Sequence, residues 1–151
     1  MNRRNLFQAG TVFALSALAA AATAAPAASA SGHEHHHHGG GAKYQALTSA
    51  SLDCIAKAEA CLAHCLVLLG QGEKEMAACA QSVNQLLAIC SAMVKLSIQE
   101  SSYLPTLAKL AGTACSDCEK QCRKHEKKHA ECKACADSCA ACLKQCKAIA
   151  A

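Results

Sequence analysis

The chain has 151 residues, enough for one domain and little more, and thirteen of them are cysteines. Its net charge is +4 with the histidines neutral, which is too weak to indicate binding to nucleic acid. No paired carboxylates, nucleophile–base set or nucleotide-binding loop stand out in the sequence, so an enzyme is the least favoured class.

Residues 1–30 are typical of an export signal. Two arginines at positions 3 and 4 precede an alanine-rich apolar run, and Ala28-Ser29-Ala30 offers a cleavage site between small residues. The run is too short for a membrane span, so we expect no membrane segment in the mature form. The arginine pair followed by x-Leu-Phe resembles a twin-arginine signal, which exports folded proteins; an ordinary secretory signal is the alternative. Both predict an exported, periplasmic protein.

Residues 31–41 are predicted to form a flexible, histidine-rich tail. Five histidines lie here among glycines, with Glu34 interrupting the run. That interruption, and the position directly after a natural signal, favour a native tract that binds metal loosely over an expression tag.

In residues 42–151, cysteines or apolar residues recur every three or four positions. This spacing is typical of helices that each bury one face. The first predicted helix runs from about position 44 to 68 and ends at Gly70-Gln71-Gly72. The second covers about 76–97, the third about 104–125 with Pro105 in its first turn, and the fourth about 129–149. Four such helices with short links predict an all-α, antiparallel four-helix bundle.

The cysteines lie on the predicted core face of every helix. Between Cys132 and Cys146 five of them follow at spacings of 3, 4, 3 and 4, which places all five on one stripe. The aliphatic residues are few, so the cysteines must fill part of the core. The candidate metal ligands among them are Cys54, Cys61, Cys65, Cys79, Cys90, Cys115, Cys118, Cys122, Cys132, Cys135, Cys139, Cys142 and Cys146.

Three kinds of chemistry are open to these thiols: disulfides, zinc or iron–sulfur sites, and binding of Cu(I). Disulfides between neighbours on one helix are disfavoured by distance, and an odd number of cysteines leaves one unpaired. Zinc and iron–sulfur clusters need compact sets of ligands, and we expect no separated groups of four along straight helices. Cu(I) prefers soft thiolates, accepts two or three of them and allows them to bridge, so the capacity would be on the order of one ion per thiol.

The sequence resembles the bacterial copper storage proteins. The resemblance rests on Cys61-Leu62-Ala63-His64-Cys65, on Met76-Ala77-Ala78-Cys79 and on the ladder from Cys132 to Cys146, behind an export signal. It implies a bundle that stores or sequesters several Cu(I) ions, a homotetramer of the exported branch, and His64 and Met76 as further copper ligands at an open mouth. No motif identifies a protein that delivers or receives the copper.

A second function class remains open at this point. A copper chaperone or delivery protein would bind one or a few ions, whereas a store would bind about as many ions as it has thiols. A helical protein stabilised by zinc or by disulfides is a further alternative.

The antiparallel topology predicts two unlike ends. His64, Met76, His125 and His129 gather at one end. His125 and His129 belong to a charged run that is more typical of a solvated turn, so they are not predicted as ligands. The apolar residues that close the other end are Tyr44, Leu47, Leu104 and Ile149. Beside the cysteine stripe of the first helix, a strip of Ile55, Leu62, Leu66 and Leu69 is predicted to join chains into the oligomer.

Overall fold

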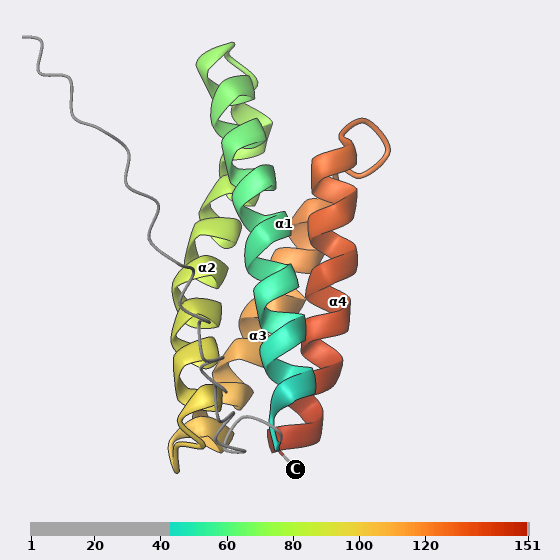
Figure 1. Cartoon of the computed structure of the whole chain (residues 1–151). Coiled ribbons are helices and arrows are strands. Elements are labelled where there is room, and N and C mark those ends of the chain that lie inside the picture. Colours follow the sequence, from blue (N-terminus) through green and yellow to red (C-terminus); the bar gives the residue numbers. More distant parts are fainter. Residues whose placement is uncertain (1–42, 151) are drawn as a thin grey trace, which may run out of the picture. The chain divides into compact units, whose positions relative to one another are not determined.

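The computed structural model describes residues 43–150, which form four α-helices and one short 3-10 turn (Figure 1). The export signal and the histidine-rich tail lie outside the described residues. The elements are α1 (Gln45–Gly70), η2 (Lys74–Met76), α2 (Ala77–Ile98), α3 (Leu104–Arg123) and α4 (Ala130–Ala150). The predicted all-α, four-helix fold is confirmed, and each predicted helix boundary lies within about two residues of the observed one.

The helices end where the sequence offers suitable residues. Gly72, at φ 95°, adopts the left-handed conformation after α1. The N–H of the next residue, Glu73, then donates to the carbonyl of Leu68 at 3.0 Å and closes the last turn of α1. Pro105 stands in the first turn of α3, where no helical N–H is needed.

The turn between α3 and α4 contains neither glycine nor proline. Arg123 holds it instead, because its guanidinium donates to Glu119 at 3.2 Å, Glu126 at 2.8 Å and Asp137 at 2.7 Å. One side chain thereby joins the end of α3, the turn and the second turn of α4.

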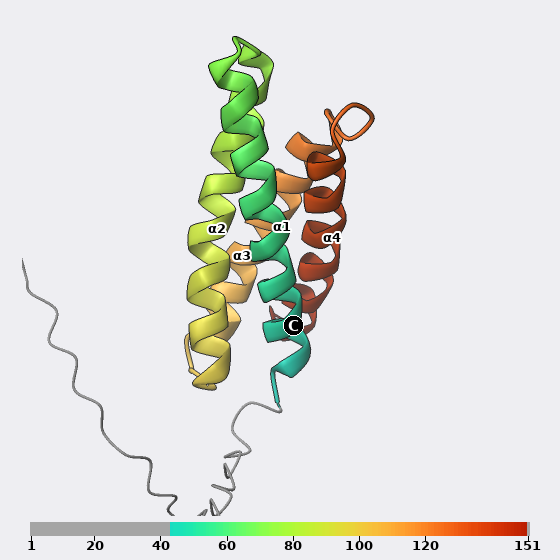
Figure 2. The ribbon, with the colours of Figure 1, turned by 45° about the horizontal axis from the view of Figure 1, so that its top comes forward.

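The helices form a ring in which each packs against the next in the chain and α4 packs against α1 (Figure 2). The α1–α2 and α3–α4 turns lie at one end, which we call the paired-turn end, and the α1–α2 hairpin extends further than the α3–α4 turn (Figure 1). The opposite end holds the α2–α3 turn, the start of α1 and the end of α4.

Apolar side chains close this opposite end, as predicted. Leu47 and Leu104 are buried, and Tyr44 and Ile149 are partly buried and pack against the core cluster. We call it the closed end. Just inside it, the hydroxyl of the buried Ser51 donates to the carbonyl of Leu47 at 2.8 Å, so the core begins with satisfied polar atoms rather than with thiols.

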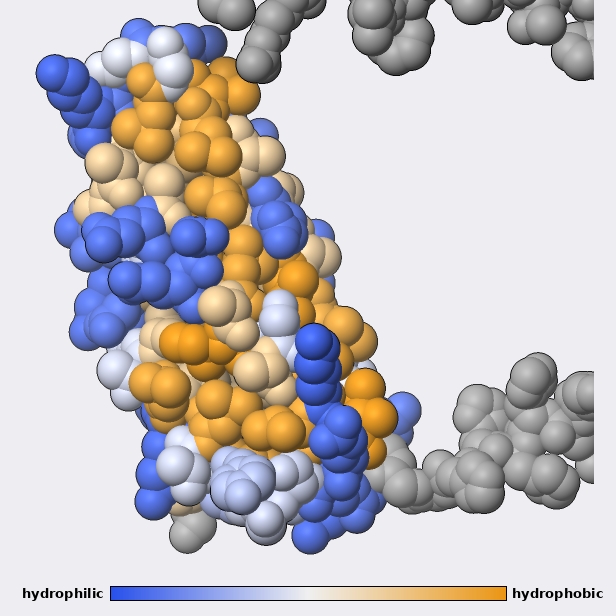
Figure 3. Space-filling model, turned by 90° about the vertical axis from the view of Figure 1, so that its left-hand side faces the viewer, coloured by the Kyte–Doolittle hydropathy of each residue, from blue (hydrophilic) through white to orange (hydrophobic). Residues whose placement is uncertain are grey.

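One helix is unusually apolar. The segment Lys74–Ile98 is long and apolar enough, by length and composition, to cross a membrane. Its Cys79, Leu86 and Cys90 are buried in the bundle, so packing in the core accounts for the apolar residues on one face of this segment. Figure 3 views the molecule from the side where α2 lies in Figure 1. Apolar surface extends along most of the length of this side.

Candidate metal centre

All thirteen cysteines lie where the sequence predicted them, inside the bundle. Each is a free thiol with no exposed surface, and each helix supplies at least two. Because the stripe of every helix faces the same axis, the sulfur atoms form a column that runs most of the bundle's length. A set of soft ligands is thereby enclosed in a core that excludes water.

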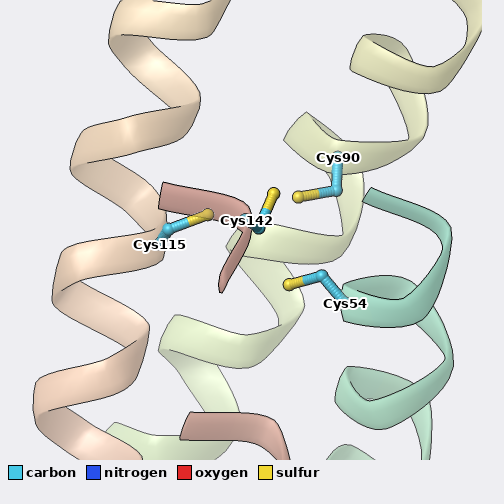
Figure 4. Close-up of side chains that lie close together, drawn as sticks. All are labelled: Cys54, Cys90, Cys115 and Cys142. Atoms are coloured by element: carbon cyan, nitrogen blue, oxygen red, sulfur yellow. The ribbon is translucent and has the colours of Figure 1, made fainter. Parts of the chain in front are cut away.

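Nearest the closed end, four thiols from four different helices meet. The sulfur atoms of Cys54, Cys90, Cys115 and Cys142 all lie within 4.8 Å of one another, and Figure 4 shows them converging on a common centre. We call these residues the four-helix thiol group. No pair of them is close in sequence, so only the packing of the helices brings them together.

Further groups follow toward the paired-turn end. Cys118, Cys135 and Cys139 form a group of three, Cys61, Cys122 and Cys135 form the next, and Cys61, Cys65, Cys79 and Cys132 form a second group of four. Two groups of four therefore exist, which the spacing along single helices does not show. They are not separated, however, because neighbouring groups share Cys61 and Cys135, and Cys54 lies 4.0 Å from Cys139.

The sulfur–sulfur distances suit a bridging metal. Cys79 and Cys122 lie 3.5 Å apart, Cys61 and Cys132 3.8 Å, and Cys118 and Cys135 3.9 Å. With a metal–sulfur bond of roughly 2.3 Å, two ligands of a trigonal ion lie about 4.0 Å apart, and two ligands of a linear ion about 4.6 Å apart. Small rotations of side chains would therefore suffice for one ion to join each pair.

The thiols influence one another's ionisation. Burial, and then the proximity of Cys79, raises the pKa of Cys65 from 9.0 to about 11. In the four-helix thiol group, a hydrogen bond from Cys115 lowers the pKa of Cys142, and donation to Cys142 raises that of Cys115; Cys146, outside the group, also lowers the pKa of Cys142. One thiolate is thus stabilised at the expense of its neighbours, and metal binding must displace the remaining protons.

The two predicted ligands other than cysteine lie at the paired-turn end. His64, near the end of α1, has a side chain that is 24% exposed. Met76 ends the 3-10 turn before α2 and is fully buried, so it is a core side chain rather than part of an exposed mouth.

The sequence interpretation missed a partner of His64. Nε2 of His64 lies 2.9 Å from Nδ1 of His129, and Oε2 of Glu131 lies 3.8 Å from the same Nε2. His129 precedes Cys132 by three residues, so it continues the α4 stripe by one turn; this spacing was the available signal. His125 lies further off, with its ring centroid 6.5 Å from that of His129.

Comparisons with known proteins agree with this geometry. A family model described as "Copper storage protein" matches residues 40–151. Apo copper storage protein 3 from Bacillus subtilis is 28% identical; the match covers 71% of this chain and 98% of that one, with a TM-score of 0.63. The Cu(I)-bound copper storage protein BsCsp3 is also 28% identical, with coverages of 72% and 99% and a TM-score of 0.64. No curated protein sequence gives a significant match.

Proposed function

Because this chain belongs to the copper storage protein family, we propose that its thirteen core cysteines are the ligands with which it stores multiple Cu(I) ions. The observation that carries this assignment is the sharing of thiols between adjacent groups. Ligands that serve two groups are suited to a chain of bridged Cu(I) ions, and they are unsuited to isolated tetrahedral zinc sites.

Two comparisons support the proposal. The solved structure of BsCsp3, whose fold this chain resembles over 72% of its length, holds Cu(I). The family is one of storage rather than catalysis. The chain would hold a reserve of copper for copper enzymes, or sequester an excess of it.

Capacity is the decisive measurement. Anaerobic titration of the reduced protein with Cu(I), against a competing chelator of known affinity, should reach on the order of ten or more ions per chain, because each thiolate can bridge. Counting the free thiols in the same samples excludes loss by oxidation. Saturation at one to four ions would contradict storage by the whole column and favour a delivery protein instead.

We further propose that the protein acts after export, in the periplasm. The arginine pair and the apolar run of residues 1–30 support this assignment. Cell fractionation of the wild-type chain and of a variant with Arg3→Lys and Arg4→Lys tests it. Export of wild type together with retention of the variant would support a twin-arginine signal; equal export would favour an ordinary secretory signal.

A further inference from the structure

Met93 is a buried side chain that lies between the thiol column and the apolar closed end. It is located on the core face of α2, one turn beyond Cys90, and has no exposed surface. Its thioether Sδ lies 3.9 Å from Sγ of Cys146 on α4. Cys146 is the one core cysteine that belongs to none of the four thiol groups described above.

The distance between these two sulfur atoms suits a shared ion. A trigonal ion with metal–sulfur bonds of roughly 2.3 Å separates its ligands by about 4.0 Å. A third sulfur is close along the chain, because Cys142 of the four-helix thiol group precedes Cys146 by one turn on the core face of α4. The pair therefore stands next to the four-helix thiol group without being part of it.

The thioether also solves a problem of charge at this end. A thioether is a soft ligand for Cu(I) and carries no charge, whereas each added thiolate brings a negative one. Cu(I) bound by one thiolate and one thioether is neutral overall, and a third ligand that is a thiolate shared with a Cu(I) ion of the four-helix thiol group is already balanced by that ion. A neutral site is favoured where Leu47 and Leu104 separate the core from water, because an uncompensated buried charge is costly.

A purely structural role for Met93 would require only a side chain of this volume. Leu86 and Leu104, both fully buried, fill core positions on α2 and α3 with hydrocarbon. At position 93, by contrast, a sulfur atom is directed at the one thiol that lacks a group. We propose that Met93 and Cys146 form a thioether–thiolate Cu(I) site, the last site of the column before the closed end.

This inference rests on the proposed function, since copper must first reach the core, and the experiment separates the two. The chain contains three methionines, Met1, Met76 and Met93. In selenomethionine-labelled full-length protein with Met76→Leu, selenium remains only at positions 1 and 93. The double variant with Met76→Leu and Met93→Leu retains only position 1 and measures the background.

Both proteins are loaded with Cu(I), their copper per chain is measured, and X-ray absorption is recorded at the selenium edge. We expect a copper neighbour at bonding distance from selenium in the Met76→Leu protein and its loss in the double variant. Capacity should fall by about one ion with Met93→Leu, a substitution that conserves volume and keeps the core packed. Circular dichroism verifies that the helices persist.

Selenium surrounded only by carbon, in Met76→Leu protein that still binds on the order of ten ions, would overturn the site while leaving the store intact. Wild-type protein that binds only one to four ions would instead overturn the proposed function, and this inference with it. The selenium signal therefore tests the Met93–Cys146 site, and the copper content tests the storage function, independently of each other.

Discussion

At the scale of single residues, the cysteines combine two properties that usually exclude each other. As protonated thiols they are small, buried and mostly apolar, so we expect the bundle to pack without metal. As thiolates they are metal ligands. The pKa of each thiol sets the free-energy difference between its protonated and ionised forms. The effect of that difference on protein stability can therefore be measured by changing the pH.

The stability of the apo protein should fall at alkaline pH. The pKa of Cys65 is raised from 9.0 to about 11 in the fold, because burial and then Cys79 disfavour the thiolate. The stabilisation is thus complete below pH 9 and is lost as the pH rises through about 11, since the unfolded chain releases this proton first. Thermal melts of reduced apo protein from pH 7 to 11 measure the fall, and Cys65→Ala should make it shallower. A variant with the same alkaline slope as wild type would refute the assignment.

Shared thiols should matter more than unshared ones. Cys135 belongs to two groups and Cys90 to one, although both are fully buried. We expect Cys135→Ala to lower the copper capacity by about two ions and Cys90→Ala by about one, because a bridging ligand serves two ions. Titration with Cu(I) under the conditions used for wild type gives both numbers. Equal losses would argue against bridging through Cys135.

At the scale of elements, the axial order of the column gives the bundle a direction. The hydroxyl and hydrocarbon groups of Ser51, Leu47 and Leu104 occupy the closed end, and the thiol groups follow. Imidazoles come last, where the end of α1 meets the start of α4. Copper that enters or leaves along the axis should therefore pass His64 and His129, because the buried hydrocarbon side chains of Leu47 and Leu104 fill the core at the closed end.

Removing the ligands at the paired-turn end should change rates more than capacity. His64→Ala combined with Met76→Leu should alter the rate of Cu(I) uptake or of chelator-driven release, with a loss of only a few ions. Leucine is preferred at position 76, because alanine at this fully buried site would leave a cavity that costs about 2–5 kcal/mol. Stopped-flow absorbance measures both rates, and His125→Ala, at the same end but away from His64, is the control. Unchanged rates at unchanged capacity would place the route elsewhere.

At the scale of the whole molecule, large apolar side chains are exposed or partly exposed on the outer surface of α1 and α2. Leu66 is 57% exposed on α1, and Ile55, Leu62 and Leu69 are partly buried beside it. Val67 and Ile98 add further exposed apolar surface on α1 and α2. An apolar strip of this kind outside the core is typical of an interface between protein chains.

We propose that this strip joins chains into a homotetramer. Light scattering at micromolar concentration should then give the mass of four chains for wild type. Leu66→Lys should shift the protein toward smaller species, because an unpaired charge would be buried in the interface. Leu110→Lys, at an equally exposed leucine on α3, is the matched control and should leave the mass unchanged. A wild-type monomer would contradict the proposal directly.

The sequence by itself determined the helices, their approximate ends and the burial of every cysteine. These properties are local: the repeat of three and four residues describes one face of one helix, and Gly72 or Pro105 act within a single turn. The family resemblance followed from the same short-range patterns, because the cysteine motifs lie within single helices.

Only the tertiary structure decided which side chains meet. Cys54, Cys90, Cys115 and Cys142 converge because four helices pack at one particular axial offset, and no spacing along the chain encodes that offset. The same offset brings His129 to His64 and Met93 to Cys146. It is set by the fit of all the core side chains at once, so a slide of one helix by a single turn would keep every stripe buried and exchange every partner.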